Sequence, residues 1–233
     1  QLVQLNGSWI TQLADPTVAL REKMTLFWHD HFACRVRSAY LAQQQNNTLR
    51  KHALGNFREL LFAISKDPGM LQFLNNQQNK KDSPNENFAR EILELFTLGR
   101  GNYSEQDIRD SARAFTGWSF HPLTGEFVFR DRVHDTGIKS FKGKNGRFYG
   151  EDILDISLDD KQTALFITEK IWQHFVSSNT RDEDIINSLA DTFFHSGYQL
   201  DKLLTDVFSS TWCYYPRFTG NRSKSPGELI VSI

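Results

Sequence analysis

Two histidines in the run FWHDHF, His29 and His31, are the first residues whose types and spacing could bind a metal. Imidazoles two residues apart chelate a metal readily on a strand, where positions i and i+2 share one face. The apolar spacing around them is helical, and on a helix the same separation turns the two side chains about 200° apart. His31 also falls in the apolar stripe, which favours a hydrogen-bonded histidine in the core. The pair is therefore a candidate for a divalent metal only if the helix ends at this point.

A second candidate group lies in the predicted helix SPNENFAREILELFTLG. Its polar residues recur at helical spacing on the face opposite an apolar stripe that ends at Leu95, and they are Asn87, Arg90, Glu91 and Glu94. One interpretation is a solvated face with the i,i+4 ion pairs Glu86–Arg90 and Arg90–Glu94. The other is that Glu91 and Glu94 point into a cavity as acid, base or metal ligands, with Arg90 keeping one of them ionised.

The third group, His134 and Asp135 with Lys139, lies in the stretch VHDTGIKSF. A loop histidine beside an aspartate can act as a general base or as a pair of ligands for a hard metal. The same dipeptide can form an Asx-type turn that carries a surface histidine. Spacing alone favours the turn.

Basic and aromatic residues interleave around this third group. Between positions 130 and 147 the basic residues Arg130, Arg132, Lys139, Lys142, Lys144 and Arg147 are balanced only by Asp131 and Asp135. With Phe141, Phe148 and Tyr149 nearby, the stretch could bind an anion, a sugar chain or single-stranded nucleic acid. We favour a solvated loop whose aromatic side chains fold back onto the core. The net charge of -1 argues against a general binder of duplex nucleic acid, and no apolar run approaches the roughly 20 residues that span a bilayer.

Helix-start patterns recur along most of the chain and position these groups. Capping patterns predict helices that begin near Asp15, Asn56, Asp67, Ser83, Ser104 and Ser157. From Trp118 to about Gly150 the pattern changes, because WSFHPLTGEFVF alternates like a hairpin and the Gly-rich segment after it is irregular. The sequence therefore predicts a mainly α, multi-helix globular domain over residues 1–233. It contains one irregular loop and β-hairpin insert at about 118–150.

The ends of the chain and the cysteines give two further expectations. The chain begins in QLVQLNGSWITQLA, which looks like the inside of a helix, and ends in SPGELIVSI, just after a predicted helix start. We therefore expect a piece of a longer protein. Cys34 and Cys213 are the only cysteines, and two buried free thiols are favoured over a disulfide.

Several sequence runs occur in an order that resembles a large bacterial family. They are FWHDHF, HALGNFRELL with DPGMLQFL, NENFAREILELFTLG, YSEQDIRDSARAFTGW and VHDTGIKSF. Over nearly its whole length the chain is similar to the domain of unknown function number 1800. The resemblance implies a mainly helical protein, usually longer than this chain and often exported, so we expect a periplasmic or extracellular location. It implies no activity.

The family pattern recurs on this chain at most of the candidate positions, namely His29, His31, Asn85, Glu86, Arg90, Glu91, Glu94, Gly117, Trp118, His134, Asp135 and Lys139. Family members commonly have Asn where this chain has Asp30, which adds a charge between the two histidines. The recurrence makes a shared polar site, joining the Arg90–Glu94 face to His134 and Asp135, as good an explanation as a solvated face. Capping and packing explain some of these positions equally well.

Two functions follow as hypotheses. The one we prefer is a non-catalytic binding or assembly module of the cell envelope, with a protein or polysaccharide partner, in which polar residues lock the insert onto the helices. The alternative is a hydrolase that acts on an envelope or extracellular substrate, with or without a divalent metal. Its catalytic groups would be Arg90, Glu91, Glu94, His134 and Asp135, which must then meet in space.

Overall fold

The computed structural model describes residues 2–36, 38–218 and 220, and the chain is 61% helical. Helices α1 to α11 span, in chain order, Leu2–Leu13, Ala19–His31, Ala39–His52, Phe57–Ser65, Pro68–Phe73, Glu86–Glu91, Glu105–Ala114, Gly150–Asp159, Lys161–Phe175, Glu183–His195 and Leu200–Ser209. Shorter helical turns are η1 (Asn76–Gln78), η2 (Ile92–Thr97), η3 (Asp131–Val133) and η4 (Thr211–Tyr214). The predicted mainly α class is confirmed.

The strands of the described residues all lie in the predicted insert, where they form two small antiparallel pairs. Strand β1 (Trp118–Phe120) pairs with β2 (Phe127–Phe129), which confirms the predicted hairpin. Strand β3 (Lys139–Phe141) pairs with β4 (Lys144–Gly146) in the Gly-rich segment that the sequence predicts to be irregular. The turn between them, Lys142-Gly143, has positive φ at both residues, as a tight two-residue hairpin requires.

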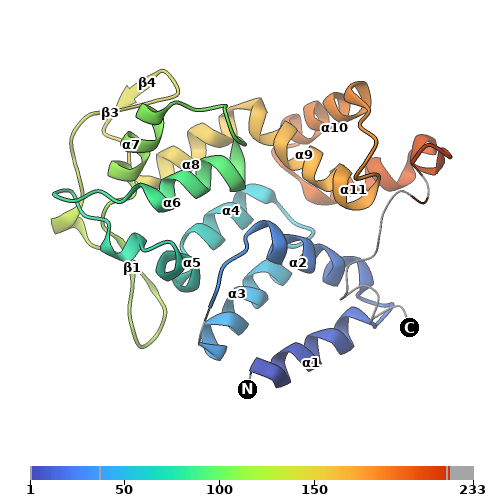
Figure 1. Ribbon diagram of the computed structural model, residues 1–233, viewed down its shortest axis with the longest axis horizontal. Helices are drawn as coiled ribbons and strands as arrows, with labels where there is room; N and C mark the ends of the chain where they lie inside the picture. Colours follow the sequence, from blue (N-terminus) through green and yellow to red (C-terminus); the bar gives the residue numbers. More distant parts are fainter. Residues whose placement is uncertain (1, 37, 219, 221–233) are drawn as a thin grey trace.

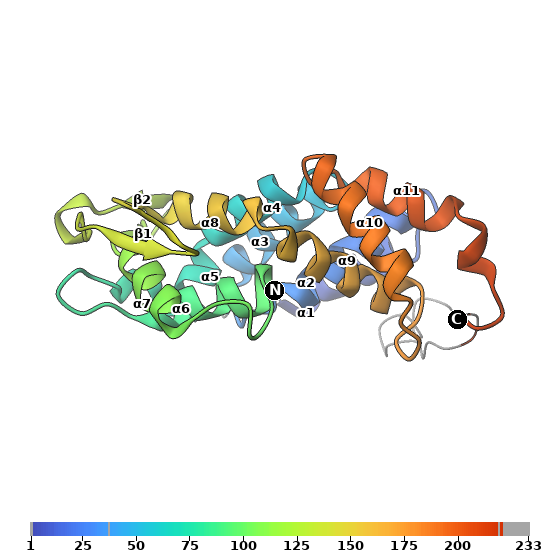
Figure 2. The same ribbon diagram turned by 90° about the horizontal axis from the view of Figure 1, so that it is seen from above.

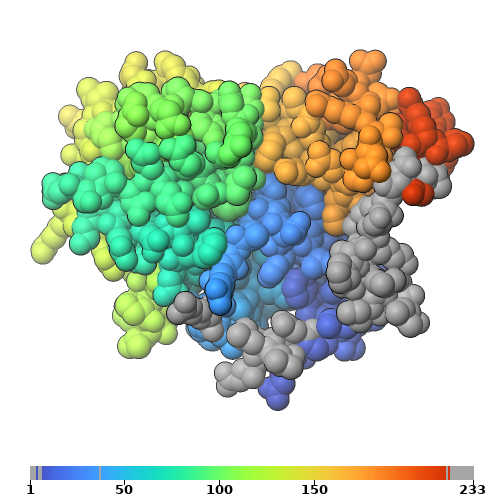
Figure 3. Space-filling view, viewed as in Figure 1, coloured from blue at the N-terminus to red at the C-terminus, as the bar shows by residue number. Residues whose placement is uncertain are grey.

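The helices form three groups around one apolar core. Figure 1 shows α9, α10 and α11 at the upper right, α6, α7 and α8 with β3 and β4 at the upper left, and α1 to α3 below. Seen from above, the β1–β2 hairpin lies at one end of an elongated molecule and α11 lies toward the other (Figure 2). The loop between β1 and β2 protrudes at the lower left of the surface in Figure 3. Buried apolar side chains form one cluster from Met24 to Phe218.

A set of long-range contacts joins the start of α4 to the turn before α11. The side chain of Asn56 donates to the carbonyl of Gly197 at 2.6 Å, and the backbone N–H of Phe57 donates to the carbonyl of Tyr198 at 2.9 Å. The hydroxyl of Tyr198 then donates to the carbonyl of Leu158 near the end of α8, at 2.7 Å. Three segments far apart in sequence therefore meet at Tyr198.

Local capping chemistry explains where several helices begin. Predicted cap residues that accept a backbone hydrogen bond in the first turn are Asn56 for α4, Asp67 for α5 and Ser104 for α7. Ser104 and Asp107 complete a reciprocal capping box, as their spacing predicts. Proline at the first position of α5 adds a fixed helical φ.

Three predicted helix starts are wrong by a few residues. Helix α2 begins at Ala19 rather than beside Asp15, α6 is capped by Asn85 rather than Ser83, and α9 is capped by Asp160 rather than Ser157. The carboxylate of Asp15 closes a local turn with Thr17 instead. The side chain of Asn79 accepts the backbone N–H of Asn85 at 2.9 Å, which fixes the chain just before α6. The hydroxyl of Ser157 donates to a carbonyl inside α8.

The predicted helix 83–99 is interrupted by a π-helical turn, η2. The backbone N–H of Leu98 donates to the carbonyl of Leu93 at 2.9 Å, and the buried hydroxyl of Thr97 donates to the carbonyl of Ile92 at 2.7 Å. The wider turn changes the register of the helix, so Leu95 is 48% exposed although the spacing places it in the apolar stripe. π-turns of this kind often occur at functional sites.

Three remaining expectations concern cysteines, the chain end and membranes. Cys34 and Cys213 are free thiols, and both are half-buried rather than fully buried. The predicted helix start near position 225 lies outside the described residues. None of the described helices combines the length and apolar composition that crossing a membrane would require.

Candidate functional site

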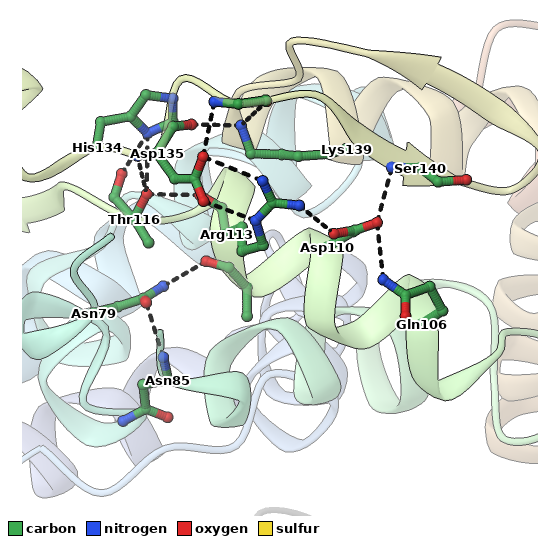
Figure 4. Close-up of polar contacts among 12 residues, drawn as sticks. Asn79, Asn85, Gln106, Asp110, Arg113, Thr116, His134, Asp135, Lys139 and Ser140 are labelled. Atoms are coloured by element: carbon green, nitrogen blue, oxygen red, sulfur yellow. Dashed lines mark hydrogen bonds and ion pairs between the residues drawn. The ribbon is translucent and has the colours of Figure 1, made fainter. Parts of the chain in front are cut away.

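A polar cluster joins the insert to helix α7, and its central residue is Arg113 (Figure 4). We call Asp110, Arg113, His134, Asp135 and Lys139 the insert cluster. The guanidinium of Arg113 donates to both oxygens of Asp135, at 2.7 and 3.3 Å, and to Asp110 at 2.6 Å. One cation on a helix therefore bridges a carboxylate of the same helix and a carboxylate of the insert.

The two carboxylates beside Arg113 are fully hydrogen-bonded. The second oxygen of Asp110 accepts the backbone N–H of Ser140 at 2.9 Å and the side chain of Gln106 at 3.1 Å. Asp135 also accepts the backbone N–H of Gly137 at 2.8 Å. Burial acts to raise the pKa of each carboxyl, but these hydrogen bonds outweigh it and hold both pKa values below the usual range for Asp. Both groups are therefore carboxylates at neutral pH.

His134 points into the insert and is buried, with 2% of its surface exposed. Its Nδ1 lies 2.8 Å from the carbonyl of Thr116, to which a neutral imidazole can donate. The ring stacks on Tyr149 at 4.5 Å and meets the edge of Phe129 at 5.1 Å. Burial lowers the pKa of His134, so the ring is neutral at pH 7. The predicted Asx-type turn is present at Asp135, but the predicted surface position of the histidine is wrong.

Lys139 has only 1% of its surface exposed. Its ammonium donates to the backbone carbonyls of Asp135 and Gly137, the second at 3.2 Å. Burial lowers the pKa of this lysine, while the nearby Asp135 carboxylate acts in the opposite direction. The ammonium therefore holds the loop 135–137 in a closed shape from the inside.

The Arg90–Glu94 face lies on α6 and η2, and most of its charges have partners. Arg90 pairs with Glu86 at 3.3 Å, as predicted, and with Glu105 of α7 at 3.1 Å. The predicted pair between Arg90 and Glu94 is absent. Glu94 accepts instead from the hydroxyl of Tyr103 at 2.6 Å and from Arg100 at 2.9 Å.

Glu91 differs from the other charged residues of this face. It is half-buried, and no described side chain pairs with it or donates a hydrogen bond to it. Burial raises its pKa, and the nearby charge of Glu94 adds to that effect. The hydrogen bond from Tyr103 instead lowers the pKa of Glu94, with help from Arg100. Two neighbouring carboxyls thus have pKa values shifted in opposite directions.

The insert cluster and the Arg90–Glu94 face contact opposite ends of α7. Arg90 pairs with Glu105 at the start of this helix, whereas Asp135 pairs with Arg113 near its end. Eight residues of helix separate Glu105 from Arg113, which corresponds to about 12 Å along the axis. Within the described residues, no hydrogen bond or ion pair joins the two groups. The structure therefore does not bring the five predicted catalytic residues together.

Helix α2 ends at His31, but His29 and His31 both still lie within it, so the two candidate metal ligands have different surroundings. His29 packs against Trp9 at a ring distance of 5.3 Å, whereas His31 packs against Phe32 and Phe96. Burial lowers the pKa of His31 to about 3, which keeps it neutral in the apolar core. No group of three or more His, Cys, Asp or Glu side chains in the described part of the chain is arranged to hold a metal ion.

Comparison with known families gives one match. The sequence pattern described as "Protein of unknown function (DUF1800)" matches residues 1–233. The chain belongs to the DUF1800 family. No curated protein and no solved structure matches it. The sequence runs that suggested this DUF1800 relationship include both the insert cluster and the Arg90–Glu94 face.

The residue at the centre of the DUF1800 insert cluster is one that sequence reasoning missed. Arg113 lies three residues after Asp110 in DIRDSARAF, a spacing that permits an ion pair on a helix. That spacing alone gives no indication that Arg113 also reaches Asp135, 22 residues away. Tyr103 and Arg100, the partners of Glu94, were missed for the same reason.

Proposed function

We propose that this chain is a non-catalytic binding or assembly module of the bacterial cell envelope. The insert 118–150 is its recognition element, and the partner is an envelope protein or polysaccharide. The observation that carries the proposal is the orientation of the insert: its cluster of charged residues faces inward and is paired, while several large apolar side chains face outward. The resemblance to an often exported family supports a periplasmic or extracellular location.

The inward side of the insert is rigidly held. Arg113 ties Asp135 to α7, and the backbone N–H groups of Ser140 and Lys142 donate to Asp110 and Asp107 of the same helix. Because these contacts come from separate points of the insert, they fix its shape before any partner arrives. A preorganised surface loses less conformational entropy when it binds.

The outward side of the insert carries exposed apolar surface. Leu123 is 87% exposed and Ile138 is 70% exposed, and Val128, Phe129 and Tyr149 are also exposed. Large exposed apolar side chains grouped on one element are typical of interaction surfaces rather than of catalytic ones. The insert therefore offers apolar contact area for a partner, while the charges of the insert cluster are paired on its inner side.

Binding to envelope material tests the proposal. Purified chain is mixed with an insoluble bacterial envelope fraction, and both co-sedimentation and the release of soluble fragments are measured. We expect co-sedimentation without fragment release, and weaker binding for the double variant Leu123→Ser with Ile138→Ser. The control variant, Ile10→Ser with Leu20→Ser, removes two aliphatic side chains that are 41% exposed and lie outside the insert. Equal binding by both variants would contradict the role of the insert.

One observation favours a second candidate, a hydrolase centred on Glu91 and Glu94. Carboxyls whose pKa values are shifted apart can serve as acid and base in one reaction. The half-buried Glu91 has the raised pKa and would donate the proton, and Glu94 has the lowered pKa and would act as base. His134 and Asp135 take no part in this version, because they contact the far end of α7.

The same sedimentation assay separates this candidate from the first. A hydrolase would release soluble fragments from the envelope fraction, and Glu91→Gln would abolish that release while leaving the fold intact. The control Glu183→Gln changes an exposed glutamate at the start of α10 and would leave release unchanged. Absence of release by the unmodified chain would remove the hydrolase from consideration.

A further inference from the structure

The basic residues of the insert divide into two groups. Lys139 and Lys142 are held by backbone carbonyls, and Lys142 and Lys144 pair with aspartates. The side chains of Arg130, Arg132 and Arg147 are exposed and have no hydrogen-bond or ion-pair partner among the described residues. Arg130 and Arg132 lie two residues apart in one segment. The unpaired arginines therefore have their full set of donors available to a ligand.

Two exposed lysines from a distant segment lie beside these arginines. The backbone N–H of Gly117 donates to the carbonyl of Asn79 at 3.1 Å, and the carbonyl of Gly117 accepts the backbone N–H of Arg130 at 2.8 Å. The backbone N–H of Lys81 donates to the carbonyl of Val133 at 2.8 Å. The segment 79–81 thus runs beside 130–133, and both lie at the insert end of the molecule (Figures 1 and 2). Neither Lys80 nor Lys81 has a side-chain partner in the described chain.

Two partly exposed aromatic rings lie near the backbone that joins these segments: the ring of Phe129 approaches Gly117, and the ring of Tyr149 adjoins that of Phe129. Phe129 precedes Arg130 directly and is 38% exposed, and Tyr149 is 40% exposed. The two rings lie 5.9 Å apart, and both contact the buried ring of His134, at 5.1 and 4.5 Å. The buried imidazole of His134 therefore fixes the positions of both rings from the inner side of the insert.

The surface is moderately basic on a chain that is slightly acidic overall. Segments 80–82 and 130–132 carry the four cations Lys80, Lys81, Arg130 and Arg132 together with the exposed Asp82 and Asp131, which leaves an excess of four minus two, or two positive charges, in these two segments. The whole chain has a net charge of -1. Positive side chains that are interspersed with negative ones match a polymer whose negative charges are spaced apart. They match the densely charged phosphate backbone of a nucleic acid less well.

We propose that this basic–aromatic patch, formed by Lys80, Lys81, Phe129, Arg130, Arg132 and Tyr149, binds an anionic polysaccharide. The inference rests on the proposed function as a binding module and names the chemical class of its partner. Arginine donates two parallel hydrogen bonds to a carboxylate or sulfate group. The apolar C–H face of a sugar ring packs on the negative face of an aromatic ring. Both kinds of side chain are exposed at this end of the molecule.

Binding to defined polymers tests the patch directly. We would measure the affinity of the whole chain for polygalacturonate, a carboxylated polysaccharide, and for dextran, a neutral one, at low and at physiological ionic strength. We expect polygalacturonate to bind, dextran to bind far more weakly, and the affinity for polygalacturonate to fall as salt screens the charges. A short single-stranded oligothymidine is the third probe, because it carries charge and stacking bases on a phosphate backbone.

Substitutions locate the binding. The triple variant Lys81→Gln, Arg130→Gln, Arg132→Gln should weaken polygalacturonate binding by about tenfold or more, since it removes three charged donors. A matched triple variant, Arg35→Gln, Lys51→Gln, Lys202→Gln, removes three exposed cations elsewhere and should keep affinity within about twofold. Phe129→Leu retains apolar volume but removes the aromatic face, and should lower affinity several-fold with unchanged thermal stability.

The outcomes separate this inference from the proposed function. Unchanged polygalacturonate binding by the patch triple variant, or tighter binding of oligothymidine than of polygalacturonate, would overturn the polysaccharide assignment. If the chain still sediments with envelope material and the Leu123/Ile138 variant does not, the binding module stands without this patch. If neither polygalacturonate nor envelope material binds, both proposals fail.

Discussion

Arg113 carries much of the connection between the insert and the helices. Its three hydrogen bonds run to Asp110 and Asp135, whose side chains are 6% and 18% exposed, so the two negative charges lie where water solvates them poorly. Removing the cation would leave two partly buried carboxylates facing each other. Removing one partner of a buried ion pair lowers the free energy of unfolding by more than the intact pair contributes to it, because the other charge stays buried without a partner.

The first prediction concerns this arginine. Arg113→Met should lower the free energy of unfolding by about 2 to 3 kcal/mol, measured by chemical denaturation at neutral pH. The control Arg109→Met lies on the same helix, where the exposed Arg109 donates to the side chain of Gln106, and it should change stability by less than about 0.5 kcal/mol. Equal effects of the two substitutions would show that the bridge contributes little.

The second prediction concerns pH and Asp67, the cap of α5. Burial raises its pKa to about 6, against hydrogen bonds from Met70 and Gln45 that lower it. A carboxyl with a raised folded-state pKa binds its proton more tightly in the folded chain, so its contribution to stability is full below pH 4 and is lost as pH rises through 6. Asp67→Asn retains a cap and should remove this loss, giving a flatter stability profile between pH 4 and 7. A profile unchanged by the substitution would contradict the raised pKa.

At this scale the sequence identifies candidate residues but not their partners. His134, Asp135 and Lys139 were selected from spacing, and the structure places all three in one cluster. Their roles depend on Arg113 and Thr116, whose proximity is created by the fold and not by local spacing. Histidine orientation is likewise set by packing, so a loop pattern that predicts a surface ring fails for His134.

The π-turn η2 is the element that determines how the Arg90–Glu94 face is arranged. Its wider turn breaks the i,i+4 spacing from which the Arg90–Glu94 ion pair was predicted, and Glu94 lies instead beside Tyr103 and Arg100. The turn also leaves Leu95 in solvent. Sequence periodicity assumes a regular helix, so it could not predict either consequence.

The third prediction tests what stabilises this turn. Thr97→Val removes the hydroxyl that donates to the carbonyl of Ile92 in a fully buried position, and should cost about 1 to 2 kcal/mol in a denaturation experiment. Thr205→Val removes a matching bond, to the carbonyl of Asp201 at 2.7 Å on an exposed helix face. Water can replace that bond, so the cost should be below about 0.5 kcal/mol. A larger loss of unfolding free energy for Thr205→Val than for Thr97→Val would refute the argument.

The predicted helix starts are correct where the chain offers a single candidate cap residue. Asn56, Asp67 and Ser104 accept the bonds that their patterns predict. At Ser83 and Ser157 a second polar residue nearby caps the helix instead, because contacts from elsewhere in the fold fix the chain there. Capping patterns therefore locate helices to within a turn, and tertiary contacts decide the final residue.

At the scale of the whole molecule, a close backbone contact at Gly150 adds to the polar contacts that join the insert to the rest of the fold. A Cβ atom at Gly150, the first residue of α8, would lie 2.4 Å from the ring of Trp118 and 2.6 Å from that of Phe115. Both rings are buried and cannot move aside cheaply. The helix backbone therefore packs directly on the rings where α7, the insert and α8 meet.

The fourth prediction follows from that contact. Gly150→Ala should lower the free energy of unfolding by about 3 kcal/mol, which would be measured as a much lower melting temperature or as failure of the protein to accumulate in folded form. Gly7→Ala, at a helix position with nothing within 4 Å of the added Cβ, should be neutral or stabilising by up to about 1 kcal/mol. A normal melting temperature for Gly150→Ala would mean that the rings can shift.

The broad architecture was predictable because periodicity and turn residues report it locally. The mainly α class and the position of the insert follow from such patterns, and both are confirmed. The separation of the two polar groups along α7 was not predictable, because recurrence in a family pattern carries no information on distance. Placing them needs the two ion pairs with α7, from Arg90 to Glu105 at its start and from Asp135 to Arg113 near its end.

The contacts between Asn56 and Gly197 have a consequence for how the chain is made. Synthesis runs in the direction from the N-terminus to the C-terminus, so α4 leaves the ribosome long before the turn to which it binds, 141 positions later. Until that turn arrives, the apolar face of α4 has no cover from the C-terminal helices. Contacts of such wide sequence separation slow folding, so we expect this part of the core to form late.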